Sequence, residues 1–118
     1  MIITKAFEFD SAHNLVNYMG KCEKLHGHTY RLEVSLEGKP NNEGIVFDFV
    51  EMKKIIEEKV VDKLDHTYIN DTIKQPSAEN IAIWVWNQLN SLFGDIILHE
   101  VKVFESKESW VTYRGEHE

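Results

Sequence analysis

Residues 26–37 of the chain read HGHTYRLEVSLE, a run in which two kinds of side chain alternate at every step. One face is apolar or aromatic apart from two histidines, and it consists of His26, His28, Tyr30, Leu32, Val34 and Leu36. Successive side chains of a β-strand point to opposite sides, so this period of two predicts a strand with one buried face. The two histidines therefore extend an apolar surface.

A preceding strand with the same period is predicted from Ile2 to His13. Its core-facing positions are Ile3, Phe7, Phe9, Ser11 and His13. Residues 14–24, which include Cys22, contain Asn14, Asn17, Gly20 and Lys21, and these residues indicate a loop that returns the chain to the sheet.

Two amphipathic helices are predicted next. Asp48 is a good N-cap with Glu51 in the capping-box position, and the first helix ends at Asp65-His66. Ser77 caps the second helix, which Gly94 closes. The buried stripes are Phe49, Met52, Ile55, Ile56, Val60 and Leu64 in the first helix, and Ile81, Ala82, Val85, Leu89, Leu92 and Phe93 in the second.

Two further strands are predicted, over residues 96–106 and 108–114. The element order ββααββ predicts an α+β fold, with a four-stranded, mainly antiparallel sheet and two helices on one face. The other face, which includes Thr29, Arg31, Glu33, Ser35 and Glu37, is expected to be wet. Such a sheet has two open edges, which oligomerisation would cover.

The length of 118 residues predicts a single domain over residues 1–118. The net charge of -7 argues against binding to nucleic acid or an anionic membrane, and it favours a small-molecule partner. No apolar run is long enough to span a membrane, and residues 1–5 lack the layout of a signal peptide. A single cysteine allows no internal disulfide, so we expect a cytoplasmic protein.

Three histidines form a candidate metal site. His26 and His28 project from one face of their strand and can bind the same ion. His13 lies on the core-facing side of the preceding strand, and it would join them if the two strands are neighbours. Three imidazoles with an open position are typical of catalytic zinc. A His-x-His pair alone is also typical of polar residues at a strand end.

Cys22 has three interpretations. An isolated cysteine is most often a small buried hydrophobe. Its position between Lys21 and Lys24 favours the thiolate, which would act as a base or nucleophile. As a fourth metal ligand it would instead close the site and make the zinc structural.

Two acidic positions are further candidates. Asp65 beside His66 can orient and polarise an imidazole for proton transfer, although a histidine at a helix C-terminus also suits the helix dipole. Glu105 continues the face of apolar strand residues, and a buried anion needs a partner. A ligand with N–H donors would supply that partner, and Lys107 is the structural alternative.

These residues together resemble one known family along nearly the whole chain. The motifs are Ser11-Ala12-His13, Cys22-x3-His26-Gly27-His28-x-Tyr30, Phe47-Asp48-Phe49, Leu64-Asp65-His66, Pro76-Ser77-Ala78-Glu79-Asn80-Ile81-Ala82 and Val101-x-Val103-x-Glu105. In this order they resemble the 6-pyruvoyl-tetrahydropterin synthase family. Ser77 and Ser106 stand where that family commonly has threonine, and both keep the hydroxyl.

The resemblance implies a tunnelling fold, a homo-oligomer with active sites at subunit interfaces, and a role for each matching residue. It implies zinc ligation by His13, His26 and His28, a catalytic base at Cys22, proton transfer by Asp65 and His66, and pterin binding by Glu105. The three residues between Cys22 and His26 are similar to the 6-carboxytetrahydropterin synthases of queuosine biosynthesis.

The expected activity is therefore that of a zinc-dependent carbon–carbon lyase. It would convert 7,8-dihydroneopterin triphosphate to 6-carboxy-5,6,7,8-tetrahydropterin, acetaldehyde and triphosphate. The alternatives are a 6-pyruvoyl-tetrahydropterin synthase, an aldolase-like activity on the same substrate, a noncatalytic zinc-containing pterin-binding protein, and a structural zinc protein.

Overall fold

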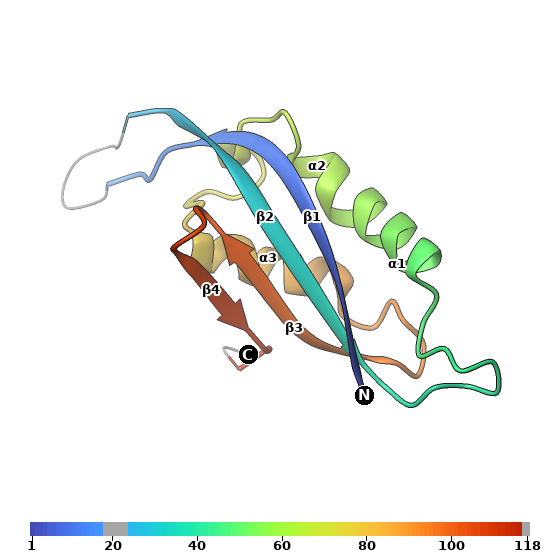
Figure 1. Ribbon diagram of the computed structural model, residues 1–118. Coiled ribbons are helices and arrows are strands. Elements are labelled where there is room, and N and C mark those ends of the chain that lie inside the picture. Colours follow the sequence, from blue (N-terminus) through green and yellow to red (C-terminus); the bar gives the residue numbers. More distant parts are fainter. Residues whose placement is uncertain (18–23, 117–118) are drawn as a thin grey trace.

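The computed structural model describes residues 1–17 and 24–116, which form a four-stranded sheet backed by helices. The strands are β1 (Ile2–His13), β2 (His26–Glu37), β3 (Ile97–Phe104) and β4 (Trp110–Tyr113). They lie in the order β1-β2-β3-β4, and each neighbouring pair is antiparallel (Figure 1). Among the described residues, no further strand pairs with the outer edge of β1 or β4, and only an isolated bridge between Ala12 and Tyr68 covers the end of β1. The predicted α+β sheet is confirmed.

Two helical segments cover the same face of this sheet (Figure 1). The first is continuous along the chain and consists of α1 (Phe49–Ile56), the π-helical turn η1 (Glu57–Val61) and α2 (Asp62–Leu64). A short 3-10 turn, η2 (Ile69–Asp71), leads towards the second, α3 (Ala78–Leu89). None of the described helices combines the length and apolar character needed to cross a membrane.

Both predicted N-caps are present. The carboxylate of Asp48 accepts a hydrogen bond from the backbone N–H of Val50 at 3.2 Å. The hydroxyl of Ser77 accepts one from the backbone N–H of Asn80 at 3.1 Å. Each bond satisfies a donor that has no partner within the helix itself, and this fixes where the helix begins.

The π-helical turn keeps a stripe of residues spaced by four on one side of the first helix. In an α-helix, residues four apart are rotated by about 40° around the axis, so such a stripe would drift off the core. Met52, Ile56, Val60 and Leu64 are nevertheless all fully buried. The wider turn of η1 compensates for the drift.

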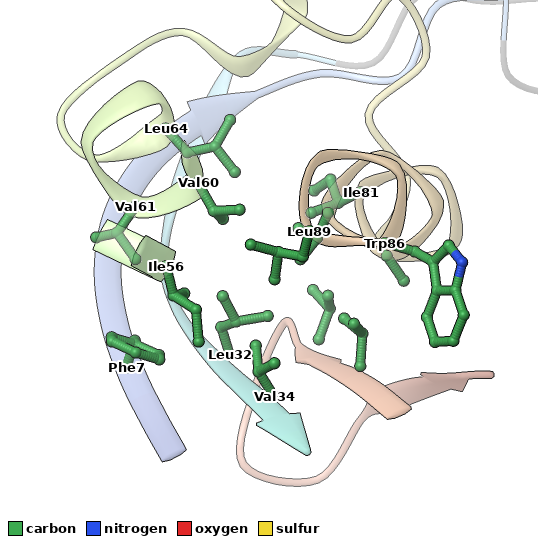
Figure 2. Close-up of a cluster of buried hydrophobic side chains, with 14 of the residues drawn as sticks. Phe7, Leu32, Val34, Ile56, Val60, Val61, Leu64, Ile81, Trp86 and Leu89 are labelled. Atoms are coloured by element: carbon green, nitrogen blue, oxygen red, sulfur yellow. The ribbon is translucent and has the colours of Figure 1, made fainter. Parts of the chain in front are cut away.

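The core lies between the sheet and the helices, where side chains from every layer meet (Figure 2). The labelled members are Phe7, Leu32, Val34, Ile56, Val60, Val61, Leu64, Ile81, Trp86 and Leu89. Burying each large apolar side chain contributes about 1.5–3 kcal/mol, so this cluster supplies the main stabilisation of the fold.

Some expectations at the element ends are wrong. Phe49 is 49% exposed and Leu92 is also exposed, although both belong to predicted stripes. α3 ends at Leu89 rather than at Gly94, and the chain turns there. Phe49 is the first residue of α1 and Leu92 lies past the end of α3, so regular helical spacing does not hold either side chain against the sheet.

The face of the sheet opposite the helices is mostly polar, although Phe104 and Trp110 stack on it with ring centroids 5.1 Å apart. Ser35 was expected to be wet, but it is buried and its hydroxyl lies 2.7 Å from that of Thr4. The register of β2 against β3 shifts just after Ser35. On the same face, the carboxylate of Glu100 is only 12% exposed and lies 2.9 Å from Nη2 of Arg114.

Candidate metal centre

The register of β1 and β2 places the three predicted histidines on one face. His13 is opposite His26 and Ser11 is opposite His28, so all these side chains point to the helix-covered side at the end of the hairpin. His13 is buried and the other two imidazoles are partly exposed. The prediction that His13 lies beside the His-x-His pair is confirmed.

The three imidazole rings meet edge to face. Their centroids are 4.7 Å apart for His13 and His26, 5.0 Å for His13 and His28, and 4.8 Å for His26 and His28. Nε2 of His13 lies 3.1 Å from Nε2 of His26. The rings thus direct nitrogen atoms at a common point.

Backbone carbonyls determine which ring nitrogens carry protons. Nδ1 of His13 lies 2.7 Å from the carbonyl oxygen of Pro76, and Nδ1 of His26 lies 2.8 Å from that of Lys24. A carbonyl only accepts, so both Nδ1 atoms are donors and, in the neutral rings, both Nε2 atoms carry lone pairs. Two lone pairs facing each other at 3.1 Å repel unless a cation lies between them. The donor set therefore fits a metal ion, and the hydrogen bond from each Nδ1 to a backbone carbonyl is typical of metal-binding histidines.

Glu105 is the fourth member of this group. It follows the last residue of β3, and its Oε1 lies 3.3 Å from Nε2 of His28. One ligand atom from each of the three histidines and Glu105 lies within 4.8 Å of all the others. The carboxylate, which is 36% exposed, contacts an imidazole where the sequence suggested a bound ligand or Lys107.

Asp65 and His66 lie at the outer edge of β1. The backbone N–H of His66 donates to the carbonyl of Asp10 at 2.6 Å, and Ala12 donates to the carbonyl of Thr67 at 3.0 Å. His66 has a φ of +55°, a conformation that costs free energy for a non-glycine residue and persists only where its surroundings hold it. The edge of β1 supplies that support.

The carboxylate of Asp65 stabilises the contact between this segment and the edge of β1 by hydrogen bonds. Its Oδ1 accepts the backbone N–H of Asp10 at 3.0 Å and lies 3.1 Å from Nδ1 of His66. The N–H of Asp10, and after it the His66 imidazole, lower the pKa of Asp65 below its ordinary value of 3.8. Asp65 is therefore ionised at neutral pH and orients the His66 ring, which is 78% exposed.

An open cavity of about 580 Å³ is bordered by one histidine of the metal group, His28, and by His66. Its lining comes from the ends of β1 and β2 and from the segment after α2, and consists of Asp10, Ser11, Ala12, Gly27, His28, Thr29, His66, Thr67 and Tyr68. His28 and His66 therefore border the same space, although they belong to segments far apart in the sequence.

Cys22 lies outside the described residues, but the chain that leads towards it from β1 is held at two points. The side-chain amide of Asn70 bonds both the N–H and the carbonyl of Asn14, at 3.0 and 2.8 Å. The amide of Gln75 does the same for Val16, at 2.6 and 3.0 Å. We name these two amides the amide clasp. The sequence did not predict the amide clasp or the hydrogen bonds from the histidines to the carbonyls of Pro76 and Lys24, because no periodic pattern indicates such contacts.

The protein is therefore an α+β protein whose four-stranded sheet carries, at the end of its first hairpin, three histidines and a glutamate that could hold a metal ion. Within that class, a family model described as 6-pyruvoyl tetrahydropterin synthase matches residues 2–116. The chain belongs to the 6-pyruvoyl tetrahydropterin synthase family, as its sequence motifs predicted.

Relatives within the family carry different names. The chain is 36% identical to the 6-pyruvoyl tetrahydrobiopterin synthase of Dictyostelium discoideum, over 98% of this chain and 97% of the relative. It is 37% identical to the 6-carboxy-5,6,7,8-tetrahydropterin synthase of Synechocystis sp., over 95% and 92%. The structure of Caenorhabditis elegans 6-pyruvoyl tetrahydropterin synthase shares the fold, with a TM-score of 0.83 and 24% identity over 98% and 95% of the two chains. The expected tunnelling fold of the subunit is confirmed.

Proposed function

We propose that the protein is a zinc-dependent 6-carboxy-5,6,7,8-tetrahydropterin synthase. It would act on 7,8-dihydroneopterin triphosphate and release acetaldehyde and triphosphate, for queuosine biosynthesis in the cytoplasm. The observation that carries this proposal is the convergence of His13, His26 and His28, with the lone pairs of two Nε2 atoms facing each other at 3.1 Å.

His13, His26 and His28 would hold the zinc ion. Bound zinc acts as a Lewis acid that polarises oxygen atoms of a substrate and so makes neighbouring C–H bonds more acidic. The carbonyls of Pro76 and Lys24 would keep two of the three imidazoles in the tautomer that presents Nε2 to the metal.

The other residues of the chain would bind the substrate and move protons. The Cys22 thiolate would accept a proton from the substrate side chain, and the lysines on either side of the cysteine favour that ionised form. His66, oriented by ionised Asp65, would exchange a proton on the other side. Glu105 would accept paired charge-assisted hydrogen bonds from the guanidine-like edge of the pterin.

The exposure of His66 supports a site that a second subunit completes. Closing an active site excludes water and strengthens the electrostatic interactions inside it, whereas the His66 ring is 78% exposed in one subunit. A homo-oligomer with sites at its interfaces would cover the ring.

A second candidate is 6-pyruvoyl-tetrahydropterin synthase activity on the same substrate. Relatives with either name are almost equally similar to this chain, at 36% and 37% identity, so overall identity does not separate the two. The short gap between Cys22 and His26 favours the carboxy-forming reaction.

The test of the proposed function combines metal content with product analysis. Purified protein is assayed for zinc and incubated with 7,8-dihydroneopterin triphosphate, and the products are identified by mass. We expect zinc, acetaldehyde and the carboxylated pterin. A product that retains its three-carbon side chain would support the second candidate, and binding without turnover would leave a noncatalytic pterin-binding protein.

Replacing Cys22 separates its three interpretations. We expect Cys22→Ala to lower kcat by about 10²–10⁴-fold, as is typical for loss of a general base, while zinc content stays at the wild-type level. Normal turnover would show that Cys22 is not the base. Loss of zinc, together with a thiolate charge-transfer band in cobalt-substituted wild-type protein, would show that Cys22 is a metal ligand.

A further inference from the structure

Glu105 stands where a metal ligand would stand, although its expected role is to bind the pterin. Its Oε1 is 3.3 Å from Nε2 of His28 and within 4.8 Å of ligand atoms on His13 and His26. Three histidines would supply three of the four ligands of a tetrahedral zinc ion, and this carboxylate is near enough to supply the fourth.

The measured separations agree with tetrahedral coordination. Ligands at about 2.0–2.1 Å from zinc lie about 3.3–3.4 Å from one another in a tetrahedron. The His13–His26 pair is separated by 3.1 Å between Nε2 atoms, and the His28–Glu105 pair by 3.3 Å. These pairs share no atom, so they correspond to two opposite edges of one tetrahedron. The remaining separations are all within 4.8 Å, and binding of one ion would draw these atoms closer together.

The backbone at Glu105 is fixed while its side chain can turn. The backbone N–H of Glu105 donates to the carbonyl of Ser109 at 3.1 Å, which closes the turn between β3 and β4. The carboxylate is attached through three rotatable bonds and is 36% exposed, so it reaches either the histidines or the open space beside them.

We propose that Glu105 is the fourth metal ligand of the substrate-free protein, and that it leaves the metal when a pterin binds. The first half concerns this chain and its metal alone. The second half rests on the proposed function, because it needs a pterin whose N–H groups attract the carboxylate. Glu105 thereby couples the recognition of the correct ring to the opening of one coordination position.

This exchange gives the enzyme a resting state that resists loss of its metal. Four protein ligands hold the ion more firmly than three, and a charged oxygen compensates part of the metal's charge. A molecule without the pterin N–H pattern would not draw the carboxylate away, so the metal would stay closed to it.

The test of the first half uses metal affinity without any pterin. Zinc affinity is measured by competition with a chromophoric chelator for wild type, Glu105→Ala and the isosteric Glu105→Gln. We expect both variants to bind zinc at least about tenfold more weakly, a loss typical of removing a group that supports a metal site. Glu108→Ala removes the same charge from the same turn and should bind zinc like wild type.

Cobalt-substituted protein reports the coordination directly. We expect the visible absorption of the Co²⁺ protein to change in Glu105→Ala, and added acetate to restore the wild-type spectrum by supplying a carboxylate. We also expect 7,8-dihydroneopterin to shift the wild-type spectrum. A zinc affinity and a cobalt spectrum that are the same in Glu105→Ala and Glu108→Ala would overturn the proposal.

The outcomes keep this proposal apart from the proposed function. If Glu105→Ala loses turnover but keeps both zinc affinity and the cobalt spectrum, Glu105 binds substrate and never the metal. If zinc affinity falls and the wild type forms no carboxylated product, Glu105 is a metal ligand and the assigned reaction is wrong. A cobalt spectrum that 7,8-dihydroneopterin leaves unchanged overturns the exchange alone.

Discussion

The orientation of the His13 imidazole depends on the backbone carbonyl of Pro76, a residue whose own side chain has no chemical role. The carbonyl of Pro76 accepts a hydrogen bond from Nδ1–H of His13, and Pro76 immediately precedes the N-cap residue of α3. The position of α3 along the chain therefore sets the orientation of an imidazole on β1. A substitution that moves the start of α3 is expected to change metal affinity even though no ligand is altered.

Asp65 should make the stability of the protein depend on pH in acid. A carboxyl whose pKa is lowered in the folded state stabilises that state above its unfolded pKa, near 3.8, and the contribution is lost as the pH falls through the folded pKa. We expect Asp65→Asn to lower the melting temperature at pH 7, and we expect the difference from wild type to shrink below about pH 4.

Circular dichroism melting between pH 7 and pH 2.5 measures this difference. Asp62→Asn, at an exposed position of α2, is the matched control and should melt like wild type at every pH. A difference between Asp65→Asn and wild type that stayed constant across the range would contradict an ionised Asp65 as the cause.

The amide clasp acts at the scale of an element, because it extends β1 without a partner strand. Asn70 and Gln75 each present an amide that mimics a neighbouring strand, and they hold residues 14 and 16, which lie two positions apart. The chain towards Cys22 therefore leaves the sheet in a fixed direction.

Removing one amide should loosen this extension locally. We expect Gln75→Leu to raise the hydrogen-exchange rate of the Val16 amide by about fivefold, which corresponds to the net contribution of one hydrogen bond, roughly 1 kcal/mol. Exchange is followed residue by residue by nuclear magnetic resonance. Gln88→Leu, on α3, is the control and should leave Val16 unchanged, whereas equal effects of the two variants would contradict the clasp.

Regular elements could be predicted because each buries one face. The alternation in residues 26–37 fixed which side of β2 meets the core, and the caps at Asp48 and Ser77 fixed where the helices begin. The convergence of His13 with the His-x-His pair followed from the same period of two, once the two strands were taken as neighbours.

Features made by backbone atoms or by single-residue irregularities could not be predicted. Any residue offers a carbonyl, so nothing in the sequence marks Pro76 as the partner of His13. The π-helical turn and the shift after Ser35 each depend on how a whole layer fits its neighbour, and no local pattern records that fit. The proximity of Glu105 to His28 depends on the turn after β3.

The open edges of the sheet matter at the scale of the whole molecule. At the end of β1, Asp10 and Ala12 direct backbone groups outward, where the segment after α2 binds them. The register is unbroken, so Ala6 also directs its N–H to the open side. Within the described part of the chain, no strand pairs with that side of Ala6.

Oligomerisation through this edge should be sensitive to proline. We expect the wild type to form a homo-oligomer, and Ala6→Pro to fold but to have a smaller mass in solution, because proline is tolerated at an open strand edge and cannot donate to a partner strand. Light scattering coupled to size exclusion measures the mass. Ala6→Ser keeps the N–H and should assemble like wild type, and an unchanged mass for Ala6→Pro would exclude this edge as an interface.

The π-helical turn also determines the direction in which the chain leaves the first helix and reaches the residues that line the cavity. Asp65 comes directly after α2. The number of residues in η1 therefore determines the direction around the helix axis in which the chain leaves α2. Losing one residue between 57 and 61 would turn the exit by about 100° and point the pair Asp65 and His66 away from β1. The π-helical turn, which accommodates one residue more than an α-helical turn, therefore helps to orient the imidazole of His66.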